Sequence, residues 1–282
     1  MSPYGVVEDA IGSTGKLFKK VKGSVESEKL TDKYELDVCS CTVLGEGNFS
    51  KVYLCQSKVH FNKVAIKDID EKNSSISRSI SKEVNILNSL VNVPGVIKLL
   101  DVYQEGQTRF LVFNAYNDGI NLENYVLANE IKGTTLKKIF GNIVNTVISL
   151  HNNKVFHGDL KPDNILILTS SMNIILLDLG SALFDYGKPL STYEGFKDYG
   201  PPETQKKPAS YYAQPASVFQ LGIILLFLVT RKVPSRELGE KFDIPLEDWE
   251  NSNGLIKSCL EKAPEDRITL NDLKDHSLCL ID

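Results

Sequence analysis

Two short runs in the middle of the chain carry the side chains best suited to chemistry. Residues 157–164 read H-G-D-L-K-P-D-N, and residues 178–180 read D-L-G. This set suits phosphoryl transfer, because Asp159 can orient a hydroxyl group while Asn164 and Asp178 offer the oxygen ligands that Mg²⁺ prefers. Each group alone could simply form a turn. Their order and spacing together argue against coincidence.

A glycine-rich run earlier in the chain could approach phosphate groups closely. Residues 44–52 read L-G-E-G-N-F-S-K-V, and glycine lets backbone N–H groups approach an anion because it has no Cβ. A plain turn between strands and a dinucleotide-binding fingerprint are the alternatives. The fingerprint needs a helix directly after its glycines, whereas residues 51–55 continue as a strand. The sequence therefore favours a hairpin that folds over phosphates.

A lysine and a glutamate could complete the phosphate site. Lys67 ends the buried-strand pattern V-A-I-K, and Glu83 follows on a predicted amphipathic helix. An exposed lysine at a sheet edge is the alternative interpretation of Lys67. A lysine that is held by a carboxylate is a positioned charge for phosphate oxygens, unlike a free surface lysine.

These groups must be positioned by a strand-rich region and a helical region that follows it. Apolar residues recur at helical spacing over 76–90 and 136–150, which predicts two helices with one buried face each. Short apolar runs between turn residues predict strands over 39–44, 52–55, 64–66, 96–103 and 110–113, and a hairpin over 165–168 and 174–177. The chain is therefore expected to be an α+β protein with two lobes that meet near residue 117.

Composition restricts the class of protein. The chain has 282 residues, of which 42% are hydrophobic and 24% charged, a balance that argues against wholesale disorder. A formal net charge of −4 argues against direct nucleic-acid binding through a globally basic surface. The longest strongly apolar stretch, residues 221–229, is far shorter than the roughly 20 residues of a membrane-spanning helix. We therefore expect a buried helix there and no transmembrane segment.

The cysteines and the N-terminal residues complete the sequence-based expectations. The five cysteines are odd in number and none stands in a C-x-x-C pair. They are interpreted as reduced thiols in the core of an intracellular protein, in the cytoplasm or the nucleus, and not as a disulfide frame or a zinc site. Residues 1–33 are rich in glycine and lysine and predict an N-terminal extension, flexible or partly helical. The alternative is an amphipathic helix that either docks on another surface or lies on a membrane.

The motifs described above occur in the order that they have in protein kinases, and residues 34–282 resemble a eukaryotic-type protein kinase domain. Pro201-Pro202-Glu203 fits the family's A-P-E motif, and Arg267 resembles the late arginine that pairs with that glutamate. Residues 218–222 resemble the start of the family's central helix. The resemblance implies the two-lobed kinase fold, with a five-stranded antiparallel sheet plus one helix over 34–117 and a larger helical lobe over 118–282. The serine/threonine kinases of the Pim type are loosely similar.

The resemblance also implies an activity and its cofactors. The activity is that of a protein serine/threonine kinase, which moves the γ-phosphate of ATP to a hydroxyl of a protein substrate with Mg²⁺ present. Lys67, held by Glu83, would steady the α- and β-phosphates of ATP. Asp159 would accept the proton of the substrate hydroxyl, and Lys161 would stabilise the transferring phosphate. A monomeric kinase domain is expected.

The ligand residues follow from the same resemblance. Asn164 and Asp178 would hold Mg²⁺, and Phe113 would narrow the pocket behind the adenine. Asp163 could read basic side chains of the substrate, although a solvated turn residue is an equal alternative. The expected nucleotide-binding residues are Leu44, Gly45, Glu46, Gly47, Asn48, Phe49, Ser50, Lys51, Val52, Lys67, Asn114 and Tyr116.

Three departures from the family pattern bear on activity. Gly158 replaces the arginine of H-R-D, Ser217 replaces an aspartate that braces the catalytic loop, and Phe196 replaces a threonine that contacts the catalytic aspartate. A nucleotide-binding pseudokinase that acts as a scaffold or regulator is therefore the alternative function. The activation segment lies between Asp178 and Glu203. Without the arginine, a phosphate in this segment, at Ser191, Thr192 or Tyr193, loses its main partner. We expect a kinase that is active without such phosphorylation.

Overall fold

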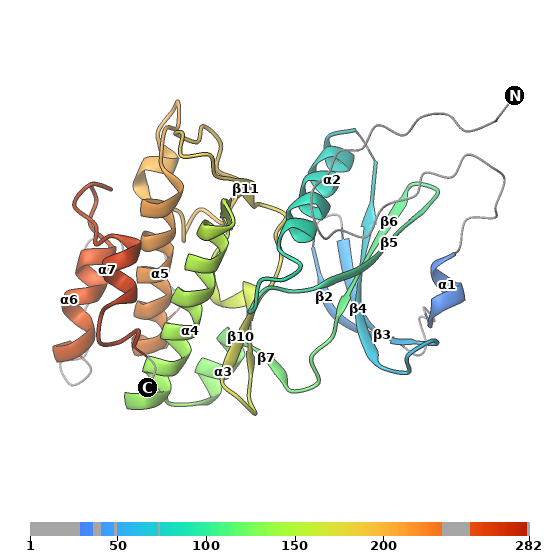
Figure 1. Cartoon of the computed structure of the whole chain (residues 1–282), viewed down its shortest axis with the longest axis horizontal. Helices are drawn as coiled ribbons and strands as arrows, with labels where there is room; N and C mark the ends of the chain where they lie inside the picture. Colours follow the sequence, from blue (N-terminus) through green and yellow to red (C-terminus); the bar gives the residue numbers. More distant parts are fainter. Residues whose placement is uncertain (1–28, 36–40, 48–49, 73, 233–248, 281–282) are drawn as a thin grey trace, which may run out of the picture.

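The computed structural model describes residues 29–35, 41–47, 50–72, 74–232 and 249–280. Figure 1 shows these residues in two parts, with a β-sheet and helix α2 at one end and a group of helices at the other. The two-lobed kinase architecture expected from the sequence is confirmed. The expectations for residues 1–28, and those for Cys39, Asn48 and Phe49, lie outside the described residues.

Six antiparallel strands form the N-terminal sheet in the described part of the chain, one more than expected. Their order is β1-β3-β4-β6-β5, and β2 pairs with β3. The additional strand is β1, whose two residues are too few to show an alternating pattern in the sequence. The strands are β1 (Tyr34–Glu35), β2 (Thr42–Glu46), β3 (Ser50–Ser57), β4 (Lys63–Asp70), β5 (Leu99–Glu105) and β6 (Thr108–Asn114).

A short helix before the sheet is packed onto it. Helix α1 (Leu30–Lys33) directly precedes β1, and the side chain of Leu30 is fully buried. The backbone N–H of Leu30 donates a 2.9 Å hydrogen bond to Oε1 of Glu105, at the end of β5. The boundary expected between residues 33 and 34 therefore separates two elements of the same lobe.

Helix α2 (Ser74–Ser89) covers one face of the sheet, as Figure 1 shows. Ile80, Ile86 and Leu87 are buried, so the apolar face predicted over 76–90 is the face that packs. Glu83 lies on the same buried face. A carboxylate in such surroundings needs a charged partner, and the helix therefore aims Glu83 at the sheet.

The second lobe consists of helices around two small sheets. Within the described residues, the order β10-β9-β7 forms one sheet, β11-β8 forms the other, and the hairpin predicted after residue 164 is confirmed. The helices are α3 (Leu122–Ala128), α4 (Gly133–Asn152), α5 (Ala213–Thr230), α6 (Trp249–Cys259) and α7 (Leu270–Lys274). The strands are β7 (Gly119–Asn121), β8 (Val155–Phe156), β9 (Ile165–Leu168), β10 (Asn173–Leu176) and β11 (Leu183–Phe184), and two short 3₁₀ helices span Pro162–Asn164 and Pro202–Gln205.

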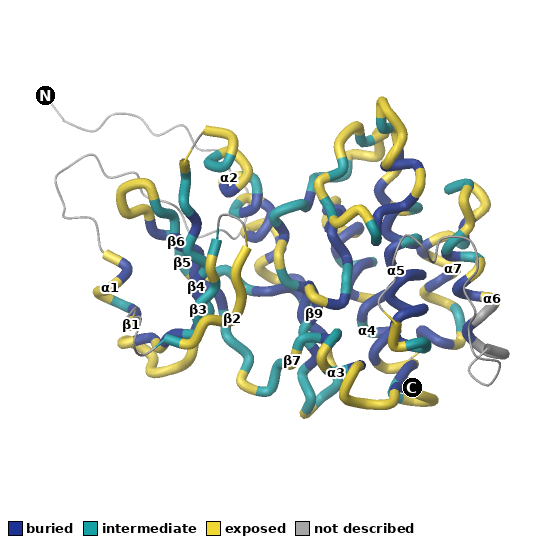
Figure 2. The backbone as a smooth tube through the Cα atoms, turned by 180° about the vertical axis from the view of Figure 1, so that it is seen from behind, coloured by how far each residue is buried: buried dark blue, intermediate teal, exposed yellow. Residues whose placement is uncertain are grey.

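Helix α5 is the central helix of this lobe. Its 18 residues are long and apolar enough to cross a membrane by length and composition, but 72% of them are buried inside the structure. Figure 2 shows the same burial along α4 and α5. The prediction of a buried helix over 221–229 is confirmed. The helix is longer than that apolar run because residues 213–220 continue it.

Candidate active site

Lys67 joins the two lobes through two carboxylates. It lies on β4 between Val52 of β3 and Leu111 of β6. Its Nζ is 3.0 Å from Oε1 of Glu83 and 3.1 Å from Oδ1 of Asp178. Burial acts to lower the pKa of Lys67, but the two carboxylates outweigh it and hold the pKa above its ordinary value. Lys67 is therefore a fixed positive charge, with Glu83 as the partner that the sequence predicts.

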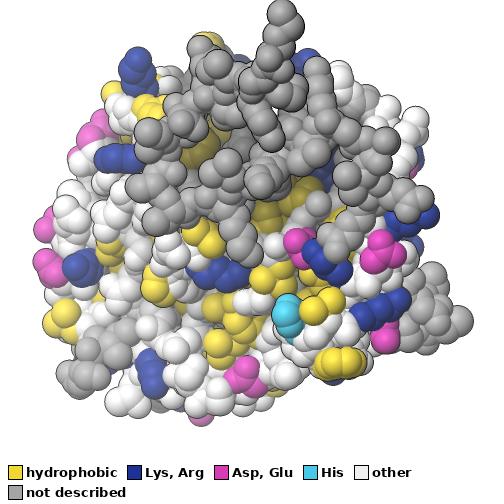
Figure 3. Space-filling view, turned by 45° about the vertical axis from the view of Figure 1, so that its right-hand side comes forward, with side chains coloured by type: hydrophobic (Ala, Val, Ile, Leu, Met, Phe, Trp, Pro, Cys, Tyr) yellow, Lys and Arg dark blue, Asp and Glu magenta, His cyan; other side chains and the backbone are white. Residues whose placement is uncertain are grey.

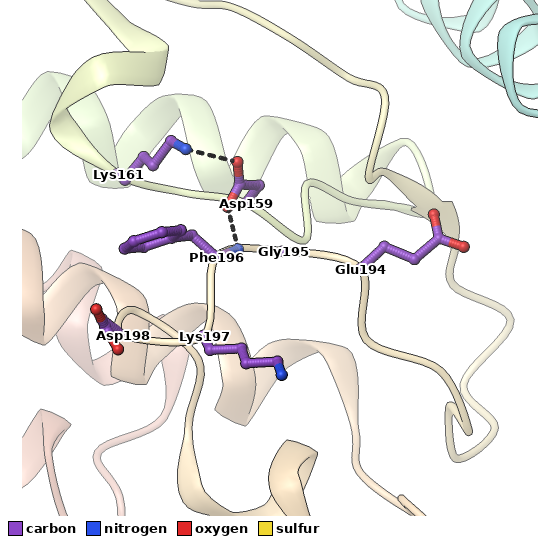
Figure 4. Close-up of a pocket in the computed structure, with 7 residues that line it drawn as sticks. All are labelled: Asp159, Lys161, Glu194, Gly195, Phe196, Lys197 and Asp198. Carbon is purple, nitrogen blue, oxygen red and sulfur yellow. Dashed lines mark hydrogen bonds and ion pairs between the residues drawn. The ribbon is translucent and has the colours of Figure 1, made fainter. Parts of the chain in front are cut away.

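Both carboxylate oxygens of Asp159 are held in place. Oδ1 accepts a 2.6 Å hydrogen bond from the backbone N–H of Phe196. Oδ2 accepts a 2.9 Å hydrogen bond from Nδ2 of Asn164 and lies 3.2 Å from Nζ of Lys161. Figure 4 shows Lys161 and the backbone of Phe196 on opposite sides of this carboxylate. Asp159 is thereby oriented at the edge of an open site.

Asn164 and Asp178 have the donor atoms that a magnesium ion requires. Nδ2 of Asn164 also donates to the backbone oxygen of Asp159, at 2.8 Å, which leaves Oδ1 of Asn164 as the atom suited to a cation. Burial acts to raise the pKa of Asp178, but the charge of Lys67 and hydrogen bonds from Lys67 and Gly180 lower it overall, so the carboxylate is ionised. These oxygen donors fit Mg²⁺.

The described part of the chain offers few ligands for a magnesium ion beside Asn164 and Asp178. Among the residues that the structure describes, no three His, Cys, Asp or Glu side chains cluster as a metal site. Magnesium keeps six oxygen ligands and often takes several from water or phosphate. Asn164 and Asp178 would thus hold the ion jointly with the phosphates of a nucleotide and not as a protein-only cage.

His157 fixes the loop that carries Asp159. Its Nε2 donates to the backbone oxygen of Leu177 at 3.0 Å, and its Nδ1 accepts from the backbone N–H of Asp159 at 3.3 Å. Complete burial lowers the pKa of His157, so the ring is neutral and can both donate and accept. The ring therefore ties the catalytic loop to the strand that leads to Asp178.

The glycine-rich run forms the hairpin between β2 and β3. The backbone N–H of Gly47 donates a 2.7 Å hydrogen bond to the oxygen of Ser50, and Lys51 forms a 2.9 Å ion pair with Glu46. A strand follows the glycines, which excludes the dinucleotide fingerprint. Val52 pairs with Lys67 in the ladder, so the hairpin adjoins the lysine that is expected to meet phosphates.

Asn114 and Tyr116 lie in the connection between the lobes. Asn114 ends β6, and its backbone N–H donates to the oxygen of Lys98 at 3.1 Å. The side chain of Tyr116 hydrogen-bonds to Asn114. Phe113 is 8% exposed and belongs to the main core. The structure therefore places these residues at the linker, beside the strand that carries Lys67, where the sequence predicts the adenine.

Phe196 keeps a contact with Asp159 in a form that the sequence did not reveal. The missing threonine hydroxyl suggested a lost contact, but the backbone N–H of Phe196 supplies the hydrogen bond. The ring is 50% exposed, and Nζ of Lys161 lies 5.1 Å from its centroid. A cavity of about 540 Å³ opens here, lined by Asp159, Lys161, Glu194, Gly195, Phe196, Lys197 and Asp198 (Figure 4).

A glutamine links the activation segment to the catalytic loop. Nε2 of Gln220, on α5, donates to the hydroxyl of Tyr193 at 3.0 Å and to the backbone oxygen of Gly158 at 3.4 Å. The hydroxyl of Tyr193 in turn donates to the backbone oxygen of Phe196 at 3.4 Å. Sequence reasoning missed this bridge. Its signal was a glutamine within the apolar stretch of residues 218–229.

Ser217 has a different partner from the aspartate that it replaces. Its Oγ is 2.8 Å from Nε2 of His151 on α4, so it connects two helices. The contact with the catalytic loop comes instead from Gln220, one helical turn farther along α5. Burial lowers the pKa of His151 to about 4, against a smaller opposing effect of Asp185. The ring is neutral and buried.

An arginine–glutamate ion pair and a pair of acidic side chains complete the site region. Arg267 donates to both oxygens of buried Glu203, at 2.6 and 2.7 Å, so the predicted pairing of these residues is confirmed. Glu123 of α3 and Asp163 share a hydrogen bond, which together with partial burial and the charge of Asp163 raises the pKa of Glu123 to about 7. The second pair is an acidic surface beside the catalytic loop.

Figure 3 shows how charged side chains are distributed on one face of the molecule. Basic and acidic side chains are interspersed there and do not form a single large basic area. The absence of direct nucleic-acid binding stays a prediction.

Comparison with known proteins gives the family. The family description "Protein kinase domain" matches residues 40–279. Serine/threonine-protein kinase SIK2 of Gallus gallus is 32% identical over 246 residues, which cover 83% of this chain and 30% of that protein. Probable serine/threonine-protein kinase fhkE of Dictyostelium discoideum is 30% identical over 286 residues, which cover 92% and 40%.

A third relative extends the pattern. SNF-related serine/threonine-protein kinase of Homo sapiens is 28% identical over 263 residues, which cover 88% of this chain and 34% of that protein. The chain thus spans 30 to 40% of the length of these curated relatives. The similarity points to SIK and SNF-related kinases and gives no specific support to the Pim-type branch.

Proposed function

The chain belongs to the protein kinase domain family, and on this premise we propose that it transfers the γ-phosphate of ATP to serine or threonine hydroxyls of protein substrates. The observation that carries the proposal is the position of Lys67, which contacts Glu83 of α2 and Asp178 of the second lobe at once. In a protein kinase the lysine–glutamate ion pair must be in place, and so must the aspartate that binds Mg²⁺.

The binding groups act by positioning and by neutralising charge. Lys67 would steady the α- and β-phosphates, and the β2–β3 hairpin would offer backbone N–H groups above them. Oδ1 of Asn164 and the ionised carboxylate of Asp178 would hold Mg²⁺. A bound magnesium ion would neutralise charge that develops on the phosphates.

Asp159 would act on the substrate hydroxyl. In the transfer, the hydroxyl oxygen forms a bond to the γ-phosphorus while the bond to the bridging oxygen breaks, and its electron pair leaves with ADP. The hydroxyl proton passes to Asp159, whose oxygens are oriented by Phe196 and Asn164. Lys161, 3.2 Å from Asp159, would stabilise the transferring phosphate.

The acidic pair suggests which substrates fit. Glu123 and Asp163 lie beside the catalytic loop and carry shared negative charge. We infer that a substrate with an arginine or lysine upstream of its phosphorylated hydroxyl would place this cation against the pair. Charge complementarity of this kind selects among partners.

The test is phosphate transfer by the purified chain with labelled ATP, Mg²⁺ and a mixture of peptide substrates. Two variants serve as controls, Asp159→Asn for the proton acceptor and Lys67→Met for the phosphate contact. We expect the Asp159→Asn rate to fall by about 10²–10⁴-fold, with nucleotide affinity retained. Lys67→Met should also lose transfer while its thermal unfolding stays cooperative.

The same experiment separates the alternative function. A scaffold that binds nucleotide without catalysis would give wild-type transfer equal to that of Asp159→Asn, with ATP affinity intact. Full turnover by Lys67→Met would contradict the role assigned to Lys67. The structure favours an active kinase, because Phe196 and Ser217, which suggested loss of function, leave the contacts of Asp159 in place.

A further inference from the structure

Two cysteines lie side by side at the base of the glycine-rich hairpin. Sγ of Cys41 is 2.6 Å from Sγ of Cys55 and 3.1 Å from the backbone oxygen of Glu35. Thr42 pairs with Leu54 in the β2–β3 ladder, so Cys41 faces Cys55 one step farther along the same antiparallel register. Both thiols are free. A disulfide bond measures about 2.05 Å, so joining these sulfurs requires only a small movement.

The two thiols differ in access to solvent. Cys41 is partly exposed, whereas Cys55 is 4% exposed and faces the core of the sheet. Burial, together with the hydrogen bond from Cys41, raises the pKa of Cys55. An oxidant from solvent would therefore meet Cys41 first, and Cys55 would be the neighbour that resolves the product.

We propose that Cys41 and Cys55 are a redox modification site, at which a peroxide reversibly forms a disulfide that ties β2 to β3. In the first step the thiolate of Cys41 attacks one peroxide oxygen, which gives a sulfenic acid on Cys41 and releases one water. The sulfur of Cys55 then attacks the sulfenic sulfur, and a second water leaves. The two thiols lose two electrons and two protons in total, and hydrogen peroxide is reduced to two waters.

The consequence falls on the glycine-rich hairpin. All residues of β2 are exposed, and β2 pairs within the described sheet with β3 alone. Hydrogen bonds to one neighbour are the main attachment of this strand, and such edges open readily. A covalent link between residues 41 and 55 would hold β2 against β3 at the base of the hairpin, at the opposite end of β2 from the turn at Gly47. The link would restrict the opening of the hairpin.

Other cysteines provide matched comparisons. Cys259 and Cys279 are both buried in the helical lobe, and burial raises the pKa of each thiol to about 12. They should react with peroxide later than Cys41. Cys39 is close in sequence and must be tested as a competing partner.

The test treats the full chain with hydrogen peroxide, blocks remaining thiols with iodoacetamide and identifies the products by intact mass and peptide mapping. Wild type, Cys39→Ser and Cys259→Ser should each lose two hydrogen atoms, with a 41–55 link that dithiothreitol reverses. Cys41→Ser should form no such link. Cys55→Ser should stop at a sulfenic acid on Cys41 that dimedone traps. A link from Cys39, or oxidation of Cys41 only to sulfinic acid in wild type, would overturn the proposal.

Amide hydrogen exchange tests the effect on the hairpin. Residues 42–54 should exchange about tenfold more slowly in the oxidised wild type than in the reduced protein. Peroxide-treated Cys41→Ser should show no change. A disulfide that forms without any slowing would refute the restriction of the hairpin. None of these measurements depends on phosphate transfer, so their outcome is separate from that of the proposed kinase activity.

Discussion

The backbone N–H of Phe196 donates a 2.6 Å hydrogen bond to Oδ1 of Asp159. The contact comes from the main chain, so it does not depend on the residue type at position 196. The phenyl ring is half exposed and faces the cation of Lys161. The absence of a threonine hydroxyl at this position is therefore compatible with an oriented Asp159.

The first prediction concerns Phe196. Phe196→Thr should change the rate of phosphate transfer by less than about tenfold, that is by less than about 1.4 kcal/mol in activation free energy. Phe196→Pro lacks the N–H and should lower the rate by more than about tenfold, because Oδ1 of Asp159 loses its donor. Initial rates at saturating ATP measure both effects.

A control separates orientation from folding in this experiment. Nucleotide affinity and the unfolding temperature of Phe196→Pro should stay close to those of Phe196→Thr, since the change is confined to an exposed turn. Equal rates for the two variants would show that the backbone hydrogen bond does not orient Asp159.

The second prediction concerns the activation segment. Ser191 and Thr192 are exposed, so Ser191→Ala with Thr192→Val should alter the rate by less than about tenfold. Tyr193→Phe removes the hydroxyl that joins Gln220 to Phe196 and should lower the rate by about tenfold, as expected for a buried polar group that loses its partner. Of these three residues, only Tyr193 is therefore expected to affect the position of Phe196 and the rate of transfer.

A double-mutant cycle with Gln220→Met checks this division. If Tyr193 and Gln220 act through one bridge, the double variant should be no slower than Gln220→Met alone. Strictly additive losses would contradict the bridge. If Ser191→Ala with Thr192→Val lost much of its rate and a phosphate mimic at Thr192 restored it, activity without phosphorylation would be contradicted.

The third prediction concerns acid stability. Because burial lowers the pKa of His151 from 6.5 to about 4, the unfolded chain binds a proton that the folded chain excludes. The free energy of unfolding should therefore fall as the pH drops from about 6.5 towards 4, and His151 should account for about 2 kcal/mol between pH 7 and pH 5. Urea unfolding of wild type and His151→Gln at both pH values measures the difference. An equal pH dependence in the two proteins would refute it.

The fourth prediction concerns substrate choice. Peptide arrays should show a preference for arginine upstream of the phosphorylated residue, and Glu123→Gln with Asp163→Asn should abolish it. The pKa of Glu123 is raised to about 7, so the pair gains negative charge as the pH rises through 7. The preference should be stronger at pH 8 than at pH 6. An unchanged array in the double variant would show that the acidic pair does not contact substrates.

The sequence was sufficient for relationships that depend on residue type and order. The pairing of Lys67 with Glu83 was predicted from residue type and position, and that of Arg267 with Glu203 from the resemblance to the kinase family. In both pairs a buried charge has an opposite partner. Strand β1 was missed because two residues carry no periodic pattern. Such short elements depend on tertiary packing.

Other features depend on the backbone or on distant contacts. The donor from Phe196 is the main-chain N–H, which every residue except proline possesses. The type of residue at position 196 therefore cannot reveal this hydrogen bond. Gln220 is distant in sequence from Tyr193 and Gly158, and only the folded chain brings the three together. A polar residue in an apolar stretch could have indicated a buried partner, but it does not indicate which one.

Gly158 limits the mutational routes that are open to this protein. Its φ is +80°, and a Cβ at this position would lie 2.6 Å from the backbone oxygen of Ser181. Restoring an arginine here would require the neighbouring backbone to move, and it would meet an activation segment already fastened by Gln220 and Tyr193. An arginine at position 158 therefore does not fit this backbone, and introducing the phosphate-binding arginine of other kinases here would need a coupled change at Ser181 or its neighbours.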